Sequence, residues 1–105
     1  MEKSFIIFCT ASSVKEARKI ADALVAEKLA ACVSIVPGVA SAYWWQGKIE
    51  HSAEALLVIK TLASKRKALE LRIKELHSYS VPEIIGWPIA WGHKPYLEWL
   101  EEINA

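Results

Sequence analysis

Residues 31–61 read ACVSIVPGVASAYWWQGKIEHSAEALLVIKT, two long strand-like segments joined by a short turn. The first segment, 31–45, is interrupted by Pro37-Gly38, where a missing N–H and a flexible residue predict a bulge or kink. Gln46-Gly47 predicts a hairpin turn, because glycine suits the second central position of a primed turn. Each strand would run to about 14 residues, against a usual ~5–6, so we expect a hairpin that extends beyond the rest of the fold.

The residues on either side predict alternating strands and helices. The apolar run 4–10 is typical of a strand buried on both faces. A helix is expected over 14–28, because Ser13 and Glu16 form a capping-box pattern in front of an apolar stripe. Ser64 is expected to cap a second helix over 65–77.

The remaining chain predicts one more strand and one more helix. Residues 81–92 read as a strand, which Pro82 and Pro88 restrict to an edge or to bulged positions. Pro95 suits the first turn of a last helix. Two strand–helix–strand units joined by a hairpin indicate a ferredoxin-like α+β sandwich with an antiparallel sheet. Right-handed crossovers place both internal helices on one face, in the strand order 4-1-3-2, within a single domain spanning 1–105.

The open face of such a sheet needs a cover. The chain is 53% hydrophobic and has five tryptophans, more apolar material than a small monomer conveniently buries. Tyr43, Trp44 and Trp45 are consecutive, so they point to both faces of the hairpin. We expect other copies of the chain to cover the open face, with these three aromatics at the contacts. The alternative is that two of them are core residues and the third is a lone surface tryptophan.

Charge and cysteine content exclude several classes of function. The net charge is +1, from 13 basic and 12 acidic residues, so there is no electrostatic footprint for nucleic acid or an anionic membrane. No segment is apolar for long enough to act as a signal peptide or membrane span. Cys9 and Cys32 make no disulfide framework. A soluble, reduced, cytoplasmic protein is the expectation.

Several stretches resemble the CutA family of divalent-cation tolerance proteins. They cover nearly the whole chain: CTASS, VAEKLAACVSIVPGVASAYWWQGKIE, LLVIKT, HSYSVPEIIGWPI and YLEWL. The resemblance implies a ferredoxin-like fold, a compact homotrimer whose strands pair between subunits, and a part in copper or divalent-cation tolerance.

The resemblance also implies copper ligands. Its proposed cysteine corresponds to Cys9, and its proposed histidine corresponds to His77 in HSYSVPE. The chain departs from the family pattern at Ser78, where proline is common, and at Leu76, where some members have a second histidine.

The predicted topology brings these donors to one rim of the sheet. Cys9 ends the first strand, His77 ends the second helix, and Glu83 begins the last strand at that same end. A thiolate and an imidazole suit copper, so Cys9, His77 and Glu83 are the predicted ligands of copper or another divalent cation. The alternatives are a buried apolar role for Cys9 and a favourable helix C-terminal position for His77.

Other charged residues suggest a second kind of site. Lys48, Glu54 and Lys60 lie in the family-like stretches and are candidates for a subunit cleft or ligand site, or for plain solvated charges. Trimeric PII-type signalling proteins share this architecture and bind small ligands in such clefts, which makes a ligand-sensing or protein-interaction module the alternative function. We expect no enzyme, because no base-and-orienter set or phosphate-binding loop accompanies Cys9.

Overall fold

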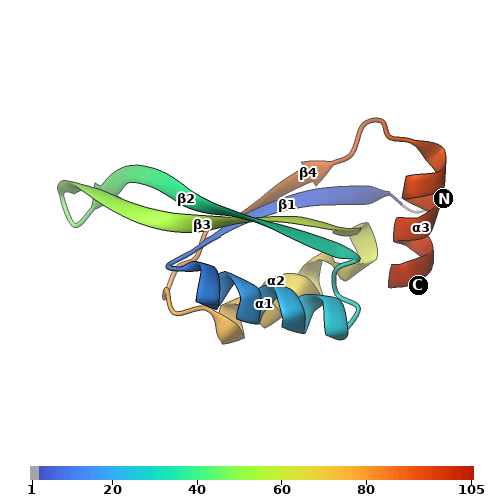
Figure 1. Ribbon diagram of the computed structural model, residues 1–105, viewed down its shortest axis with the longest axis horizontal. Helices are drawn as coiled ribbons and strands as arrows, with labels where there is room; N and C mark the ends of the chain where they lie inside the picture. Colours follow the sequence, from blue (N-terminus) through green and yellow to red (C-terminus); the bar gives the residue numbers. More distant parts are fainter. Residues whose placement is uncertain (1–2) are drawn as a thin grey trace.

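The computed structural model of the protein describes residues 3–105. Four strands and three helices follow one another along the chain (Figure 1). Their bounds are β1 Ser4–Ala11, α1 Val14–Ala26, β2 Cys32–Trp45, β3 Lys48–Leu62, α2 Arg66–Leu76, β4 Ile84–Pro88 and α3 Lys94–Asn104. The order β-α-β-β-α-β with an added C-terminal helix is the predicted one.

The sheet is antiparallel throughout and has the strand order β2-β3-β1-β4, which confirms the predicted 4-1-3-2 arrangement read from the opposite edge. Helices α1 and α2 both pack on the same face of this sheet (Figure 1). Along β1 the odd-numbered residues face these helices, and Ile7 pairs in register with Ile59 of β3. The core is formed by side chains of both layers, chiefly Ile20, Leu24, Leu57, Ile59, Leu69 and Ile73.

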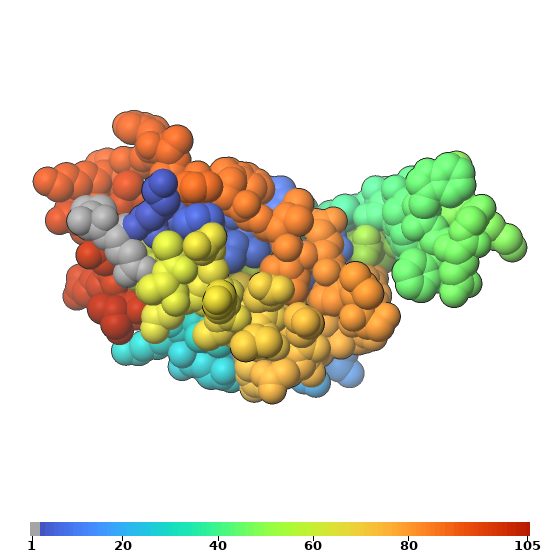
Figure 2. All heavy atoms as spheres, turned by 180° about the vertical axis from the view of Figure 1, so that it is seen from behind, coloured from blue at the N-terminus to red at the C-terminus, as the bar shows by residue number. Residues whose placement is uncertain are grey.

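The hairpin of β2 and β3 is as long as predicted. Its register shifts between Val36 and Val39, which confirms the bulge at Pro37-Gly38, and Gly38 has a φ of +69°. Gln46 and Gly47 both have positive φ, as a type I′ turn requires. Figure 2 shows the tip of the hairpin projecting from the body of the molecule.

Three expectations for local structure were wrong. Strand β4 spans only Ile84–Pro88 rather than 81–92, because prolines at 82 and 88 lack the N–H that a ladder needs. Ser64 does not cap α2, since a 3₁₀ turn over Ala63–Lys65 intervenes and Lys65 is the N-cap. Ser13 does cap α1, but Glu16 accepts from Ser12 instead of from the Ser13 backbone.

The open face of the sheet is apolar. The even-numbered residues of β1 lie on it, and Ile6 and Phe8 pair in register with Trp87 and Ile85 of β4. The rings of Phe8 and Trp87 are in edge contact, with centroids 5.1 Å apart. Ile85 is 56% exposed, so the described residues leave this face uncovered. Whereas one face of the sheet is packed by helices, the other presents an apolar surface to its surroundings.

Helix α3 closes the end of the sheet opposite the hairpin tip (Figure 1). Leu100 is fully buried against Ala31 and Leu62. The Asn104 amide donates a 2.9 Å hydrogen bond to the carbonyl of Lys28, which ties α3 to the turn after α1. Within residues 3–105, no helix combines the length and the apolar character needed to cross a membrane.

Candidate functional site

His77 joins three segments at the base of the hairpin. It follows α2 directly, and its side chain is fully buried. Its Nδ1 accepts a 3.1 Å hydrogen bond from the Tyr79 N–H. Because Nδ1 is therefore an acceptor, Nε2 holds the proton and donates to the Thr10 carbonyl at 2.7 Å. Both ring nitrogens therefore take part in hydrogen bonds, Nε2 as a donor and Nδ1 as an acceptor.

Glu16 binds the segment after α2 from the other side. Its Oε1 accepts from the N–H and hydroxyl of Ser12 at 2.9 and 2.7 Å. Its Oε2 accepts from the Ser78 N–H at 2.7 Å. Burial acts to raise the pKa of Glu16, but the hydrogen bonds from Ser12 and Ser78 outweigh it and lower the pKa to about 2. The sequence identified Glu16 only as a capping residue, and nothing local signals its bond to a residue 62 positions away.

Tyr79 and Glu54 form the next contact along this cluster. The Tyr79 hydroxyl donates a 2.8 Å hydrogen bond to Oε2 of Glu54, which is only 8% exposed. Burial, followed by the hydrogen bond to Glu54 and its charge, raises the pKa of Tyr79. Tyr79 was not among the predicted site residues, although it lies in the family-like stretch HSYSVPE.

Cys9 lies under this cluster and is fully buried. Its nearest hydrogen-bond acceptor is the Thr10 carbonyl, 3.7 Å from Sγ. Burial, and then the negative charges of Glu83, Glu16 and Glu54, raises the pKa of the Cys9 thiol to about 12. The thiol is therefore protonated and unreactive in this state. Cys32 is partly exposed. Neither cysteine forms a disulfide bond, so both thiols are free.

The predicted ligands are neighbours, but they do not form a ready-made metal site. The negative charge of Glu83 contributes to the raised pKa of the Cys9 thiol. A thiol, an imidazole and a carboxylate are donor types that copper accepts. The Cys9 thiol keeps its proton, however, and both His77 nitrogens are already hydrogen-bonded. Among residues 3–105 no three His, Cys, Asp or Glu side chains are grouped closely enough to hold an ion. The types of donor atom are therefore those that copper accepts. Their arrangement among the described residues of one chain does not form a coordination site.

An open groove of about 860 Å³ borders the same cluster. It runs between the hairpin and the segment before β4, and Glu50, Glu54 and Glu83 line it. The aromatic side chains of its lining are Tyr43, Trp45 and Tyr79. No lysine or arginine is among the described lining residues. Three carboxylates without a counter-charge make the groove attractive to cations. We refer to it below as the acidic groove.

The two lysines predicted for a subunit cleft lie far from each other. Lys48 is at the hairpin tip, opposite Trp45, while Lys60 is opposite Cys32 at the other end of β3. They are twelve residues apart, or about 40 Å at ~3.3 Å per residue. The Lys60 amine lies 3.7 Å from Cys32 Sγ. One chain therefore does not bring Lys48, Glu54 and Lys60 into one site.

The three consecutive aromatics are exposed at the tip of the hairpin. Trp44 is 73% exposed, Trp45 51% and Tyr43 43%. Ile49 pairs with Trp44 in register and is 58% exposed, so the two form an apolar pair on the face opposite Tyr43 and Trp45. No residue within 3–105 covers either set.

Known proteins match this chain over almost all of its length. The family model described as CutA1 divalent ion tolerance protein matches residues 5–103. The divalent-cation tolerance protein CutA of Thermus thermophilus is 50% identical over 97 residues, which is 92% of this chain and 94% of that one. Rice protein CutA 1, chloroplastic, is 46% identical over 98 residues. This is 93% of the present chain, which spans only about half (55%) of the rice protein.

A solved structure agrees with the fold. The periplasmic divalent cation tolerance protein CutA from Archaeoglobus fulgidus superposes with a TM-score of 0.94 at 40% identity, covering 97% of this chain and 99% of that chain. The match extends over the sheet, the hairpin and all three helices. On these similarities the chain belongs to the CutA1 divalent ion tolerance protein family.

Proposed function

We propose that the protein takes part in divalent-cation tolerance as a homotrimer that binds copper or another divalent cation. Membership of the CutA1 family supports the physiological role. The observation that carries the proposal is the acidic groove, which Glu50, Glu54 and Glu83 line. Thr10 and Tyr79, the hydrogen-bond partners of His77, also line it, and the charges of Glu83 and Glu54 act on the Cys9 thiol. A cation attracted there meets carboxylates first and softer donors beneath them.

The homotrimer is supported by the uncovered apolar surfaces. The open face carries Phe8, Ile85 and Trp87, and the hairpin tip carries Trp44 and Trp45. Exposed apolar side chains gathered in this way on a small chain mark a contact with another protein. A projecting hairpin can also pair with the edge of a neighbouring sheet, and β4 provides such an edge. Tyr43, Trp44 and Trp45 are the proposed interface residues.

Cys9, His77 and Glu83 remain the proposed ligands, and their surroundings set conditions on binding. Cys9 must lose its proton, so copper uptake through the thiolate should increase with pH and release a proton. His77 must give up its bond to Thr10 or the bond from Tyr79 to present a lone pair. Glu83 is exposed in the acidic groove and needs no such change.

The second candidate function is a trimeric module that senses a small ligand or binds a partner protein, with metal binding incidental. The volume of the acidic groove falls within the ~300–1,000 Å³ of small-molecule sites. In this reading Lys48 and Lys60 would come to the same cleft as Glu54 from different subunits. We propose no catalytic role. Location in the cytoplasm remains our prediction, and fractionation of cells producing the protein would test it.

Native mass spectrometry with one equivalent of copper per chain tests the main proposal. We expect a trimer that takes up a defined number of ions. The variants Cys9→Ser and His77→Gln should reduce that uptake. The matched controls Cys32→Ser and His51→Gln change the same residue types elsewhere and should not. A trimer that ignores copper would favour the second candidate, and a monomer would contradict the proposed assembly.

A further inference from the structure

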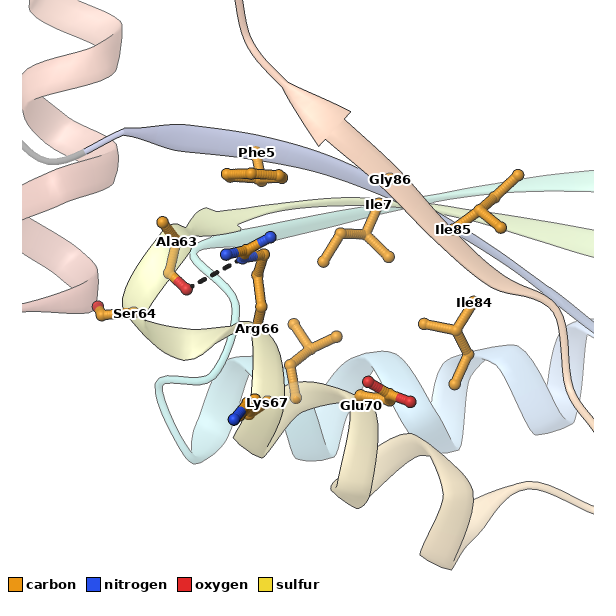
Figure 3. Close-up of a pocket in the computed structure, with 11 residues that line it drawn as sticks. Phe5, Ile7, Ala63, Ser64, Arg66, Lys67, Glu70, Ile84, Ile85 and Gly86 are labelled. Atoms are coloured by element: carbon orange, nitrogen blue, oxygen red, sulfur yellow. Dashed lines mark hydrogen bonds between the residues drawn. The ribbon is translucent and has the colours of Figure 1, made fainter.

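A second pocket is lined by other residues than the acidic groove. It opens between β1, β4 and the beginning of α2 and has a volume of about 460 Å³ (Figure 3). Its apolar lining comes from Phe5, Ile7, Leu69 and Ile84, of which the first three are buried. This volume falls within the ~300–1,000 Å³ of small-molecule sites, and the lining combines apolar side chains with a few charged ones.

One cation in the pocket is held in place from two sides. The Arg66 guanidinium lies over the ring of Phe5, with Cζ 4.3 Å from the ring centroid. Arg66 Nε donates a 3.2 Å hydrogen bond to the carbonyl of Ala63, drawn as the dashed line in Figure 3. Within residues 3–105 no carboxylate forms an ion pair with Arg66. Among the described residues no carboxylate competes for its terminal N–H groups, and stacking on Phe5 restricts the side chain.

The charge of the lining selects the kind of anion. Arg66 and Lys67 contribute two positive charges and Glu70 one negative charge, so the lining carries a net charge of +1. A planar guanidinium matches a carboxylate with two parallel hydrogen bonds. Glu70 follows Arg66 by one turn of α2 and repels a second negative charge on the ligand. The lining is therefore suited to a monoanion with an apolar body.

We propose that this pocket binds a small monocarboxylate with an aromatic or branched apolar body. The carboxylate pairs with Arg66, and the body lies on Ile7, Leu69 and Ile84. The site shares no lining residue with the acidic groove, so it does not depend on cation binding. It gives the protein a way to respond to an organic acid independently of a metal.

The test is a titration of the ¹⁵N-labelled protein followed by amide chemical shifts. Phenylacetate is the probe. Acetate lacks the apolar body, 2-phenylethylamine reverses the charge, and phenyl phosphate adds charge at the head group. We expect phenylacetate to shift amides of residues 63–70 and 84–86, with an affinity at least tenfold above those of the three comparison compounds. Amide shifts confined to other parts of the molecule, or none at 10 mM phenylacetate, would overturn the proposal.

Two substitutions on the same helix complete the experiment. Arg66→Gln removes the guanidinium from an exposed position and should weaken phenylacetate binding at least tenfold. Lys74→Gln removes a charge near the other end of α2, outside the pocket, and should leave the affinity within twofold. Equal affinity in Arg66→Gln and the unsubstituted protein would refute the assignment of the carboxylate to Arg66. Tighter binding of phenyl phosphate than of phenylacetate would refute the preference for a monoanion.

Discussion

The imidazole of His77 donates from Nε2 to the carbonyl oxygen of Thr10 at 2.7 Å, so the end of α2 is fastened to the end of β1. The same ring accepts from the Tyr79 N–H, and Tyr79 in turn donates to Glu54. A residue predicted as a metal ligand is thus also a structural link between the helix layer, the sheet and the acidic groove. Its two roles compete, because a metal ion needs a lone pair that the fold already uses.

Replacement of His77 should destabilise the protein even without metal. The variant His77→Leu leaves the Thr10 carbonyl and the Tyr79 N–H without their partner. We expect the free energy of unfolding to fall by about 2–4 kcal/mol, since each buried group left unsatisfied costs ~1–3 kcal/mol. Urea unfolding in the presence of a chelator measures this. A loss below about 1 kcal/mol would mean that water replaces the imidazole without cost.

Glu16 should make stability depend on pH in the acid range. Its folded pKa of about 2 lies below the ordinary value of 4.5, so its contribution is fully present above pH 4.5 and is lost as pH falls toward 2. The variant Glu16→Gln should therefore be less stable than the unsubstituted protein at pH 7, by about 2 kcal/mol after allowance for solvent screening.

The two stability curves of that comparison should converge near pH 2. Both are measured by urea unfolding at one protein concentration, because assembly affects apparent stability. The control is Lys15→Gln, which changes a neighbouring exposed residue, whereas the Ser78 N–H donates to Glu16. A difference between Glu16→Gln and the unsubstituted protein that stays constant down to pH 2 would contradict the role assigned to the Glu16 charge.

Cys9 should resist alkylation in the folded protein. Its thiol is buried and has a pKa of about 12, so almost no thiolate exists at pH 8. In a Cys32→Ser background, where Cys9 is the remaining cysteine, iodoacetamide should leave the native protein unlabelled and should modify it fully in urea. Mass spectrometry reads both reactions. Rapid labelling of the native protein would show that the site opens, which would also make Cys9 accessible to copper.

The hairpin turn should respond oppositely to two neighbouring substitutions. Gly47 has a φ of +78°, so Gly47→Ala should cost about 1 kcal/mol of stability through left-handed strain. Gln46 has a φ of 51°, which asparagine adopts more readily. Gln46→Asn should therefore raise the free energy of unfolding by about 0.3 kcal/mol. Thermal unfolding at fixed concentration compares the pair. Equal effects of the two changes would argue that the turn relaxes in the assembly.

The open face of the sheet should control assembly. Ile85→Lys places a charge on that face at a residue that is 56% exposed in the single chain. We expect this variant to shift the proposed trimer toward monomer, measured by sedimentation velocity. Leu71→Lys is the matched control, because Leu71 is 62% exposed but lies on α2. Dissociation by Leu71→Lys alone would place the contact surface on the helices instead.

The order of elements and the strand arrangement followed from the sequence, because they depend on local patterns. Alternating apolar residues, the Ser13 cap and the Gln46-Gly47 turn are read within a few neighbouring positions. The bulge at Pro37-Gly38 was predictable for the same reason. The predicted extent of β4 was wrong because pairing with β1 and the flanking prolines, rather than hydrophobicity, decide where an edge strand stops.

The surroundings of the candidate ligands were decided by the tertiary structure alone. The sequence predicted Cys9, His77 and Glu83 as ligands at one end of the sheet, because topology fixes where strands and helices end. It did not determine that His77 is held by Thr10 and Tyr79, or that Glu16 reaches Ser78. The bonds of His77 to Thr10 and of Glu16 to Ser78 join positions 67 and 62 residues apart. Hydrogen bonds of this kind depend on side-chain direction and burial, which exist only once the layers of the fold have packed together.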